Sequence, residues 1–266
     1  FDNLTAGGHA DIPMSEFWAG RPNNNSSSKQ AAAVAHTYGR KFVGAESFTT
    51  NAEEGKWLNH PWTLKALGDL IYCGGVNRFI FHRYAHQPWL DKLPGMTMGP
   101  HGFHFERTVT WWEQGRAWLE YLARCQYLLQ EGLFVADVCY FVGEDSPGGL
   151  GGRETQPPLP EGYDYDGCDA TVLKTRLKVQ DGRIVLPDGM SYRVLVLPDR
   201  RRMTPEILAR VDELARAGAV VVGPKPVASP SLTGYPGCDA EVARLAADIW
   251  GECDGKQITE RAVGKG

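Results

Sequence analysis

Two glutamates each stand at the end of a short apolar stretch, and both are candidates for chemistry. Glu16 lies in the run Ala-Asp-Ile-Pro-Met-Ser-Glu-Phe-Trp (10–18), and Glu46 lies in Lys-Phe-Val-Gly-Ala-Glu-Ser-Phe-Thr (41–49). A parallel β/α barrel keeps its reacting groups at the C-terminal ends of its strands. Carboxylates at such ends can serve as a general acid or base, or they can ligate a hard cation.

The elements around the two glutamates read as one β-α-β unit. Thirty positions separate Glu16 from Glu46, and the stretch 29–38 between them has a helical pattern. That length matches two parallel strands joined by a crossover helix. We therefore expect both side chains to reach the same edge of a sheet.

The alternation of strand and helix continues down the chain. A helical stretch begins at His60-Pro61 and stops at the paired glycines Gly74-Gly75, and residues 77–82 read as the next buried strand. A long loop then runs to about residue 108, and apolar residues from Trp111 to Leu129 recur at helical spacing. Three strands, two intervening helices and a closing helix resemble the last quarter of a (β/α)8 (TIM) barrel.

The second half has a different composition and a separate β-α-β pattern. All seven histidines and seven of the eight tryptophans lie at or before residue 118. Beyond residue 133, two strand-like runs, 192–197 and 219–222, flank a helix that Thr204, Pro205 and Gly218 delimit. No glycine-rich phosphate-binding string is present, which favours a structural or assembly role. We expect two domains, 1–132 and 133–266.

Composition excludes several functional classes. The formal net charge of -4 leaves no basic surface for nucleic acid, and no apolar stretch approaches the ~18 residues that a transmembrane helix needs. The six cysteines are scattered and read as buried thiols, and the histidines show no zinc spacing. Because the first strand already carries a candidate catalytic residue, we expect the chain to be a C-terminal part of a longer protein.

Several blocks together resemble the α-L-rhamnosidases of glycoside hydrolase family 106. The resemblance covers residues 9–250 and rests on Val-Gly-Ala-Glu-Ser-Phe-Thr (43–49), His-Pro-Trp-Thr-Leu-Lys-Ala-Leu-Gly-Asp (60–69), Phe-His-Arg-Tyr-Ala-His-Gln-Pro-Trp (81–89), Pro-Gly-Met-Thr-Met-Gly-Pro (94–100) and Tyr-Leu-Ala-Arg-Cys-Gln-Tyr-Leu-Leu (121–129). It implies a calcium-dependent exo-hydrolase that removes α-linked L-rhamnose with inversion. It also implies a barrel followed by a flavodoxin-like (glutamine-amidotransferase-like) α/β domain.

The resemblance assigns roles to individual residues. Glu46 matches the family's general base, and Glu16 is either a calcium ligand or a second catalytic carboxylate. The general acid would lie upstream of this chain, so the isolated chain is expected to be inactive. Donors and an apolar surface for a deoxy-sugar would come from His82, Arg83, His86, Trp89 and His101. The substrate would be a rhamnose-containing glycoside or polysaccharide, degraded by a periplasmic or secreted protein of unknown oligomeric state.

Three other interpretations stay open. The chain could belong to another barrel glycosidase, such as a β-galactosidase with a flavodoxin-like domain, or it could bind carbohydrate without cleaving it. Alternatively, Glu16 and Glu46 could be structural carboxylates paired with Arg83 or Arg107. A strand-end Asp or Glu upstream of this sequence would favour the hydrolase.

Overall fold

The computed structural model describes residues 2–20, 26–97, 99, 101–150 and 155–265. Its residues group into two compact units, which are described separately. Unit 1 comprises Phe1–Ala10, His36–Gly39 and Phe134–Gly266, and unit 2 comprises Asp11–Ala35 and Arg40–Leu133. Residues 1–10 and 36–39 thus group with the C-terminal half, unlike in the predicted domains 1–132 and 133–266. The assignment of those domains to a barrel and a flavodoxin-like fold stays a prediction.

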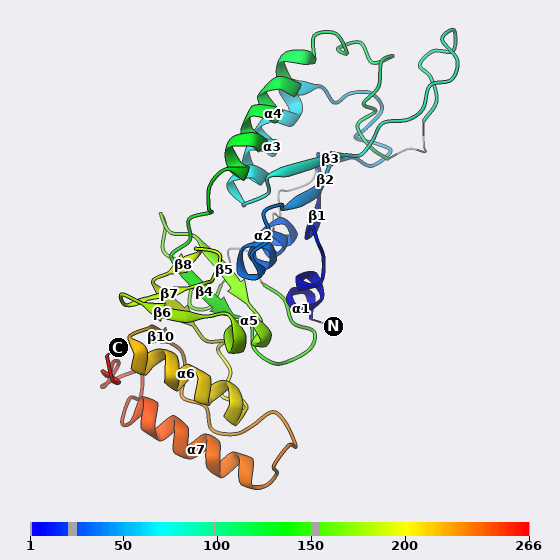
Figure 1. Cartoon of the computed structure of the whole chain (residues 1–266). Coiled ribbons are helices and arrows are strands. Elements are labelled where there is room, and N and C mark those ends of the chain that lie inside the picture. The colour runs from blue at the N-terminus through cyan, green and yellow to red at the C-terminus, as the bar shows by residue number, and fades with distance from the viewer. Residues whose placement is uncertain (1, 21–25, 98, 100, 151–154, 266) are drawn as a thin grey trace. The chain divides into compact units, whose positions relative to one another are not determined.

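Unit 2 is built on a three-stranded parallel sheet in the order β1-β2-β3 (Figure 1). The strands are β1 (Met14–Trp18), β2 (Gly44–Thr49) and β3 (Arg78–Phe81). The helices are α2 (Ser26–Tyr38), α3 (Pro61–Cys73) and α4 (Arg116–Gln130). The strand-helix alternation that the sequence predicts is present throughout this unit.

Among the described residues, helices cover one face of this sheet and leave the opposite face, here called the uncovered face, without a helix. Phe17, Phe48 and Leu64 are among the buried residues of a cluster that strands and helices share, and Phe79 and Phe81 of β3 pack against it. Neighbouring residues along a strand point to opposite faces. The residues that alternate with these aromatics therefore lie on the uncovered face, where Met14 is 51% and Ile80 is 40% exposed.

The fourth helix starts later than the apolar spacing predicts. Trp111 lies in a turn before α4, which begins at Arg116. Its indole N–H donates to the Asn59 carbonyl oxygen, and its own carbonyl oxygen accepts from the Gly115 N–H. Its ring still packs at the edge of the buried cluster, and Trp118 within the helix is buried. The spacing identified the core positions Trp118 and Leu122, but it placed the helix boundary too early and included Leu129, which is 43% exposed.

Unit 1 contains a four-stranded parallel sheet in the order β10-β9-β4-β5 and a small antiparallel sheet in the order β6-β7-β8. Its strands are β4 (Val138–Phe141), β5 (Tyr165–Cys168), β6 (Lys178–Gln180), β7 (Arg183–Val185), β8 (Ser191–Tyr192), β9 (Val194–Val196) and β10 (Val220–Val222). Its helices are α1 (Asn3–Gly8), α5 (Ala170–Thr175), α6 (Pro205–Ala217) and α7 (Gly237–Trp250). The sequence analysis missed the antiparallel sheet, whose strands have only two or three residues.

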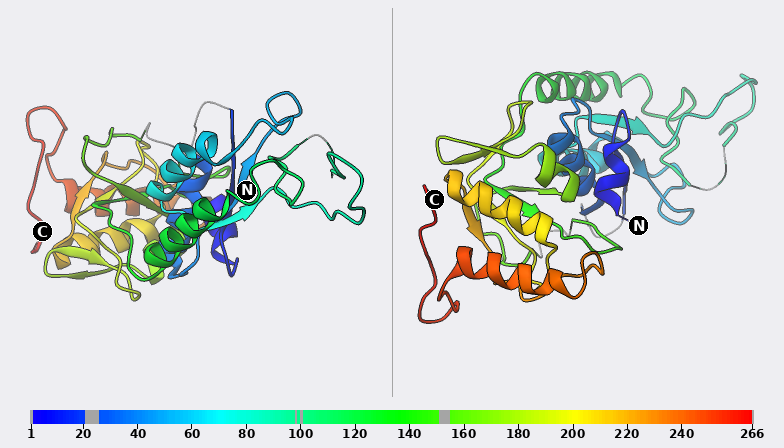
Figure 2. Two further views of the ribbon diagram at one scale, coloured as in Figure 1. Left: turned by 90° about the horizontal axis from the view of Figure 1, so that it is seen from above. Right: turned by 60° about the horizontal axis from the view of Figure 1, so that its bottom comes forward.

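The boundaries of α6 follow from its capping residues. The Thr204 hydroxyl accepts from the Ile207 N–H, Pro205 opens the helix, and Gly218 ends it in the left-handed conformation (φ 115°) that suits glycine. Helices α6 and α7 lie side by side (Figure 2). Within the described part of the chain, no helix combines the length and apolar character of a membrane span.

Candidate functional site

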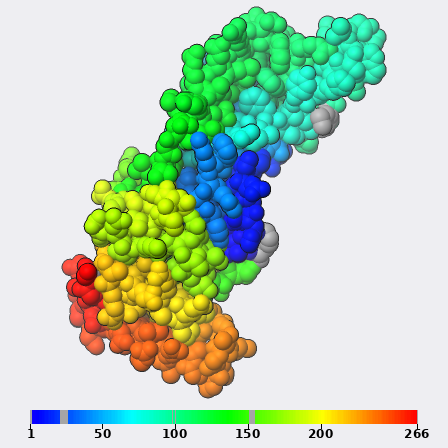
Figure 3. All heavy atoms as spheres, in the orientation of Figure 1, coloured from blue at the N-terminus to red at the C-terminus, as the bar shows by residue number. Residues whose placement is uncertain are grey.

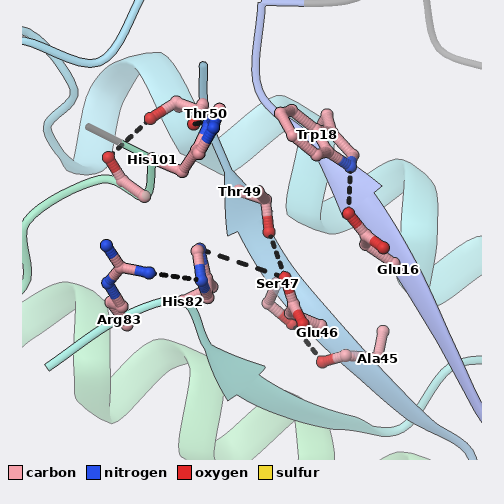
Figure 4. A network of polar contacts seen from close by, with 11 residues as sticks. Glu16, Trp18, Ala45, Glu46, Ser47, Thr49, Thr50, His82, Arg83 and His101 are labelled. Carbon is pink, nitrogen blue, oxygen red and sulfur yellow. Dashed lines mark hydrogen bonds and ion pairs between the residues drawn. The ribbon is translucent and has the colours of Figure 1, made fainter. Parts of the chain in front are cut away.

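The register of unit 2 places the two candidate glutamates directly beside each other. Glu16 of β1 pairs with Glu46 of β2, and Glu46 pairs in turn with Ile80 of β3. Paired positions of parallel neighbours point to the same face, and neighbouring strands lie about 4.8 Å apart. Both carboxylates therefore project from the uncovered face, as Figure 4 shows.

A bulge in β2 brings a hydroxyl to the Glu46 carboxylate. After Glu16 and Glu46 the register shifts, so that Trp18 pairs with Thr49, and Phe48 adopts a positive φ of 61°. The extra residue turns Phe48 into the core, where it is fully buried. Thr49 then shares the face of Glu46, and its Oγ1 donates to Glu46 Oε1 at 2.8 Å. Simple alternation would have placed Thr49 on the opposite face.

Glu16 is held within its own strand and beside the loop that follows β3. Its Oε1 accepts a hydrogen bond from the Trp18 indole Nε1. The Trp18 ring meets the His101 ring edge-on, with centroids 5.9 Å apart. His101 Nδ1 lies 3.3 Å from the Thr50 carbonyl oxygen. These contacts connect Glu16 of β1, through Trp18 and His101, to Thr50, the residue that follows β2.

His82 presents a buried nitrogen toward Glu46. Its Nδ1 is 3.9 Å from Glu46 Oε1, which is too long for a hydrogen bond. Its Nε2 lies 3.1 Å from Nη1 of Arg83, which can only donate, so a neutral His82 carries its proton on Nδ1. Among the described residues, this buried Nδ1 has no hydrogen-bond partner.

The end of the long loop is tied to the C-terminal ends of β2 and β3. The Gly102 N–H donates to the Thr50 carbonyl oxygen, and Thr50 Oγ1 donates to the Gly102 carbonyl oxygen. The Phe103 N–H donates to the His82 carbonyl oxygen. Residues 101–103 are therefore fixed at the edge of the sheet where the two glutamates lie.

Two predicted binding residues lie outside this group. Among the described residues, no hydrogen bond or ring contact joins His86 or Trp89 to the glutamates, and both are exposed. Their loop is braced by Gln87, which donates to the Met96 carbonyl oxygen and accepts from the Met96 N–H, each at 2.7 Å. Figure 3 shows the atoms of this loop, cyan to green, at one end of unit 2. Glu16, Glu46, His82, Arg83 and His101 are the predicted residues that the structure does bring together (Figure 4).

The alternative in which the glutamates pair with arginines gains no support from the contacts found for Glu46 and Arg107. The basic side chain within 4.0 Å of the Glu46 carboxylate is His82, and Arg107 donates to the Gln87 carbonyl oxygen. Calcium needs six to eight oxygen ligands. Within the described ranges, no three His, Cys, Asp or Glu side chains form a group that could hold a metal ion. Glu16 could therefore be only one member of a ligand set.

Sequence reasoning missed the supporting residues Trp18, Thr49 and Thr50. The run Glu-Ser-Phe-Thr holds a weak hint of the role of Thr49. In a regular strand, side chains three positions apart point to opposite faces, so Thr49 can reach Glu46 only if the strand is irregular between them. The contact of Trp18 with Glu16, two positions along the same strand, was accessible from alternation alone.

Comparisons with known proteins show which family this chain resembles over its whole length. A family model described as alpha-L-rhamnosidase, of glycoside hydrolase family 106, matches residues 1–266. The structure of a rhamnosidase from Novosphingobium sp. PP1Y is similar to this chain with a TM-score of 0.87 and 35% sequence identity, covering 100% of this chain and 25% of that one. A curated protein of Formosa agariphila named "Putative beta-glucuronidase" is 45% identical over 263 residues, which are 97% of this chain and 22% of that protein. The chain thus spans about a quarter of these relatives.

Proposed function

Because the chain belongs to the alpha-L-rhamnosidase family, glycoside hydrolase family 106, we propose that it supplies the general base of an inverting exo-α-L-rhamnosidase. The observation that carries this proposal is the Glu46 carboxylate, which Thr49 orients and which faces an unpartnered His82 Nδ1 across 3.9 Å. Glycoside hydrolase membership itself rests on the family match and on the similar rhamnosidase structure.

The Glu46 carboxylate is 40% exposed and can therefore meet the attacking water. A water molecule at its exposed side donates one proton to Glu46 and keeps an oxygen lone pair for the anomeric carbon. As that oxygen bonds to the carbon, Glu46 takes the proton and the glycosidic C–O bond breaks on the opposite side. The configuration at the anomeric carbon is thereby inverted.

Glu16 does not suit the role of the acid in this reaction. An inverting pair flanks the scissile bond with its carboxyl groups about 6.5–9.5 Å apart. Glu16 and Glu46 instead project from directly paired positions on one face, and both would lie on the same side of the sugar. We propose that the acid that protonates the leaving oxygen comes from outside these 266 residues and that the isolated chain is inactive.

The side chains around Glu46 suggest which sugar is bound. Ile80 is paired with Glu46 on the uncovered face and offers a half-exposed apolar surface, which fits the C6 methyl group of a deoxy-sugar. Arg83, next to His82, would instead suit the carboxylate of a glucuronide. The relative named "Putative beta-glucuronidase" makes a glucuronide the second candidate substrate. Both are carbohydrates of the kind found in polysaccharides.

Calcium remains part of the proposal through the family resemblance. Glu16 would contribute one carboxylate oxygen, and further ligands would come from residues outside this chain or from sugar hydroxyls. Bound calcium would hold two neighbouring hydroxyls of the sugar. The proton transfer described above is assigned to Glu46 alone.

The direct test is Glu46→Gln in the complete polypeptide that carries this chain. Glutamine keeps the volume and accepts the Thr49 hydrogen bond, but it cannot take up a proton. We expect kcat on an aryl α-L-rhamnoside to fall by roughly 10²-fold or more, with the melting temperature and rhamnose affinity retained. The matched control, Glu113→Gln at an exposed site before α4, should behave as the parent. A kcat within about threefold of the parent, far less than general base catalysis supplies, would exclude Glu46 as the base.

Substrate class is tested in parallel with aryl glycosides. We expect release from the α-L-rhamnoside and not from the β-D-glucuronide or β-D-galactoside, with the β-anomer of rhamnose formed first in the NMR spectrum. Preferential hydrolysis of the β-D-glucuronide would identify a glucuronide, and not a rhamnoside, as the substrate of this site. Binding of sugars without turnover of any glycoside would identify a carbohydrate-binding protein.

A further inference from the structure

An exposed tryptophan and a buried histidine are stacked beside the candidate site. The rings of Trp57 and His104 lie face to face, with centroids 4.0 Å apart and an interplanar angle of 10°. His104 is only 9% exposed, whereas Trp57 is 41% exposed. One ring is therefore held against the protein, and the other offers surface to solvent.

Both residues adopt backbone conformations that L-amino acids rarely use. Trp57 has a φ of 57° and follows Lys56 at 42°, and His104 has a φ of 53°. A left-handed backbone is unfavourable for a residue with a side chain, because its Cβ approaches the following carbonyl oxygen. The loop after β2 and the loop after β3 are therefore both strained at the residues whose rings stack, Trp57 and His104. Such strain is concentrated at binding sites.

The stack is close to the residues proposed for catalysis. Phe103, the neighbour of His104, donates its N–H to the carbonyl oxygen of His82, and His82 faces Glu46. Consecutive Cα atoms are about 3.8 Å apart, so only a few residues of chain separate the stack from the base. Phe103 is 1% exposed and packs into the core.

We propose that Trp57, supported from behind by His104, is a stacking platform for the sugar ring on the leaving side of the scissile bond. This inference rests on the proposed function, which makes the ligand a carbohydrate. An exo-acting enzyme holds the terminal sugar at Glu46 and the uncovered sheet face, and the rest of the substrate extends outward over the loops. The exposed indole face of Trp57 lies on one of those loops.

The chemistry of the platform matches a sugar ring. One face of a pyranose carries mainly C–H groups, which pack against a flat aromatic surface while the hydroxyls at the ring edge stay hydrated. Burial and the nearby Arg83 guanidinium both lower the pKa of His104 from its ordinary value, so the imidazole behind the indole is neutral at pH 7. A neutral, rigid support suits an uncharged ligand.

The test compares the affinities of one sugar and two sugars for the complete polypeptide. The probes are L-rhamnose and a thio-linked rhamnosyl disaccharide, which is not hydrolysed, measured by isothermal titration calorimetry. The parent should bind the disaccharide at least about tenfold more tightly, which corresponds to about 1.4 kcal/mol. Trp57→Ala should lose that preference, and Trp57→Phe should retain part of it. The control, Trp62→Ala, removes a tryptophan that is 85% exposed at the start of α3 and should leave the preference unchanged.

A second measurement follows ligand binding in the parent and uses a variant only to assign one resonance. The Trp57 indole N–H resonance, identified by its loss in Trp57→Phe, should shift when the parent binds the disaccharide and not when it binds rhamnose. A disaccharide preference that survives in Trp57→Ala, or an indole resonance that does not move, overturns the platform.

Failure of the proposed substrate is distinguished in the same experiment. If the parent binds no rhamnosyl ligand, the titrations use glucuronic acid, galactose and their thio-linked disaccharides. A preference for any of these disaccharides that depends on Trp57 establishes the platform and rejects rhamnose. The absence of any such preference overturns the platform.

Discussion

Asn77 fixes the register that places Glu46 beside Ile80, and its removal should destabilise unit 2. Its Oδ1 accepts from the Val43 N–H at 2.9 Å, and its Nδ2 donates to the Lys41 carbonyl oxygen at 2.9 Å. Asn77 is 7% exposed and Val43 is 1% exposed, so water cannot easily replace these bonds. The strand pairing of β2 with β3 begins at the next residue of each segment.

The magnitude for Asn77→Ala follows from the two bonds. A buried N–H left without an acceptor costs about 1–3 kcal/mol, and the lost bond to the Lys41 carbonyl contributes about 0.5–1.5 kcal/mol. The free energy of unfolding should therefore fall by about 3 kcal/mol. Asn77→Asp keeps an acceptor for Val43 but sets a buried carboxylate oxygen against the Lys41 carbonyl oxygen, so we expect a loss at least as large. Asn51→Ala is the matched control, because its side chain accepts from the exposed Glu53 and Glu54 N–H groups and should cost less than about 1 kcal/mol.

Urea unfolding followed by tryptophan fluorescence is a suitable assay, because seven of the eight tryptophans of this chain, all but Trp250, lie in unit 2. Hydrogen exchange of the Val43 amide gives a local readout in the same samples. If Asn77→Ala lowers the unfolding free energy no more than Asn51→Ala, and the Val43 amide stays protected, then these bonds do not hold the register and the reasoning is wrong.

Two further predictions concern calcium and pH. Exhaustive chelation with EDTA should abolish hydrolysis of an aryl α-L-rhamnoside by the complete polypeptide, and added calcium should restore it; activity that chelation leaves unchanged would remove calcium from the mechanism. Because the pKa of His104 is lowered from 6.5 in the folded state, the unfolded state binds the proton more tightly, and stability should fall as the pH drops below about 6.5. In His104→Gln, urea titrations between about pH 6.5 and 5 should show a smaller fall in stability. An unchanged pH dependence would contradict the assignment to His104. Arg83 and Glu106, whose charges also affect the pKa of His104, are unaltered in this variant.

Local sequence signals determined where several elements begin and end. Thr204, Pro205 and Gly218 delimit α6 as predicted, because capping depends on groups within a few residues of each other. The strand predicted over 77–82 is β3 at Arg78–Phe81, since apolar alternation is likewise a local property. The spacing of Glu16 and Glu46 implied one shared sheet edge, and the register places them in direct pairing.

Tertiary packing decided the finer arrangement of the site. Phe48 enters the core only because β2 bulges there, and that bulge turns Thr49 toward Glu46 against the alternation of the strand. Trp57 and His104, which stack on each other, are 47 positions apart in different loops, and no sequence pattern in either loop predicts the contact. Contacts of this kind depend on which distant side chains compete for one space. Sequence periodicity therefore identified the strands that carry the chemistry, whereas packing decided which side chains surround the carboxylates.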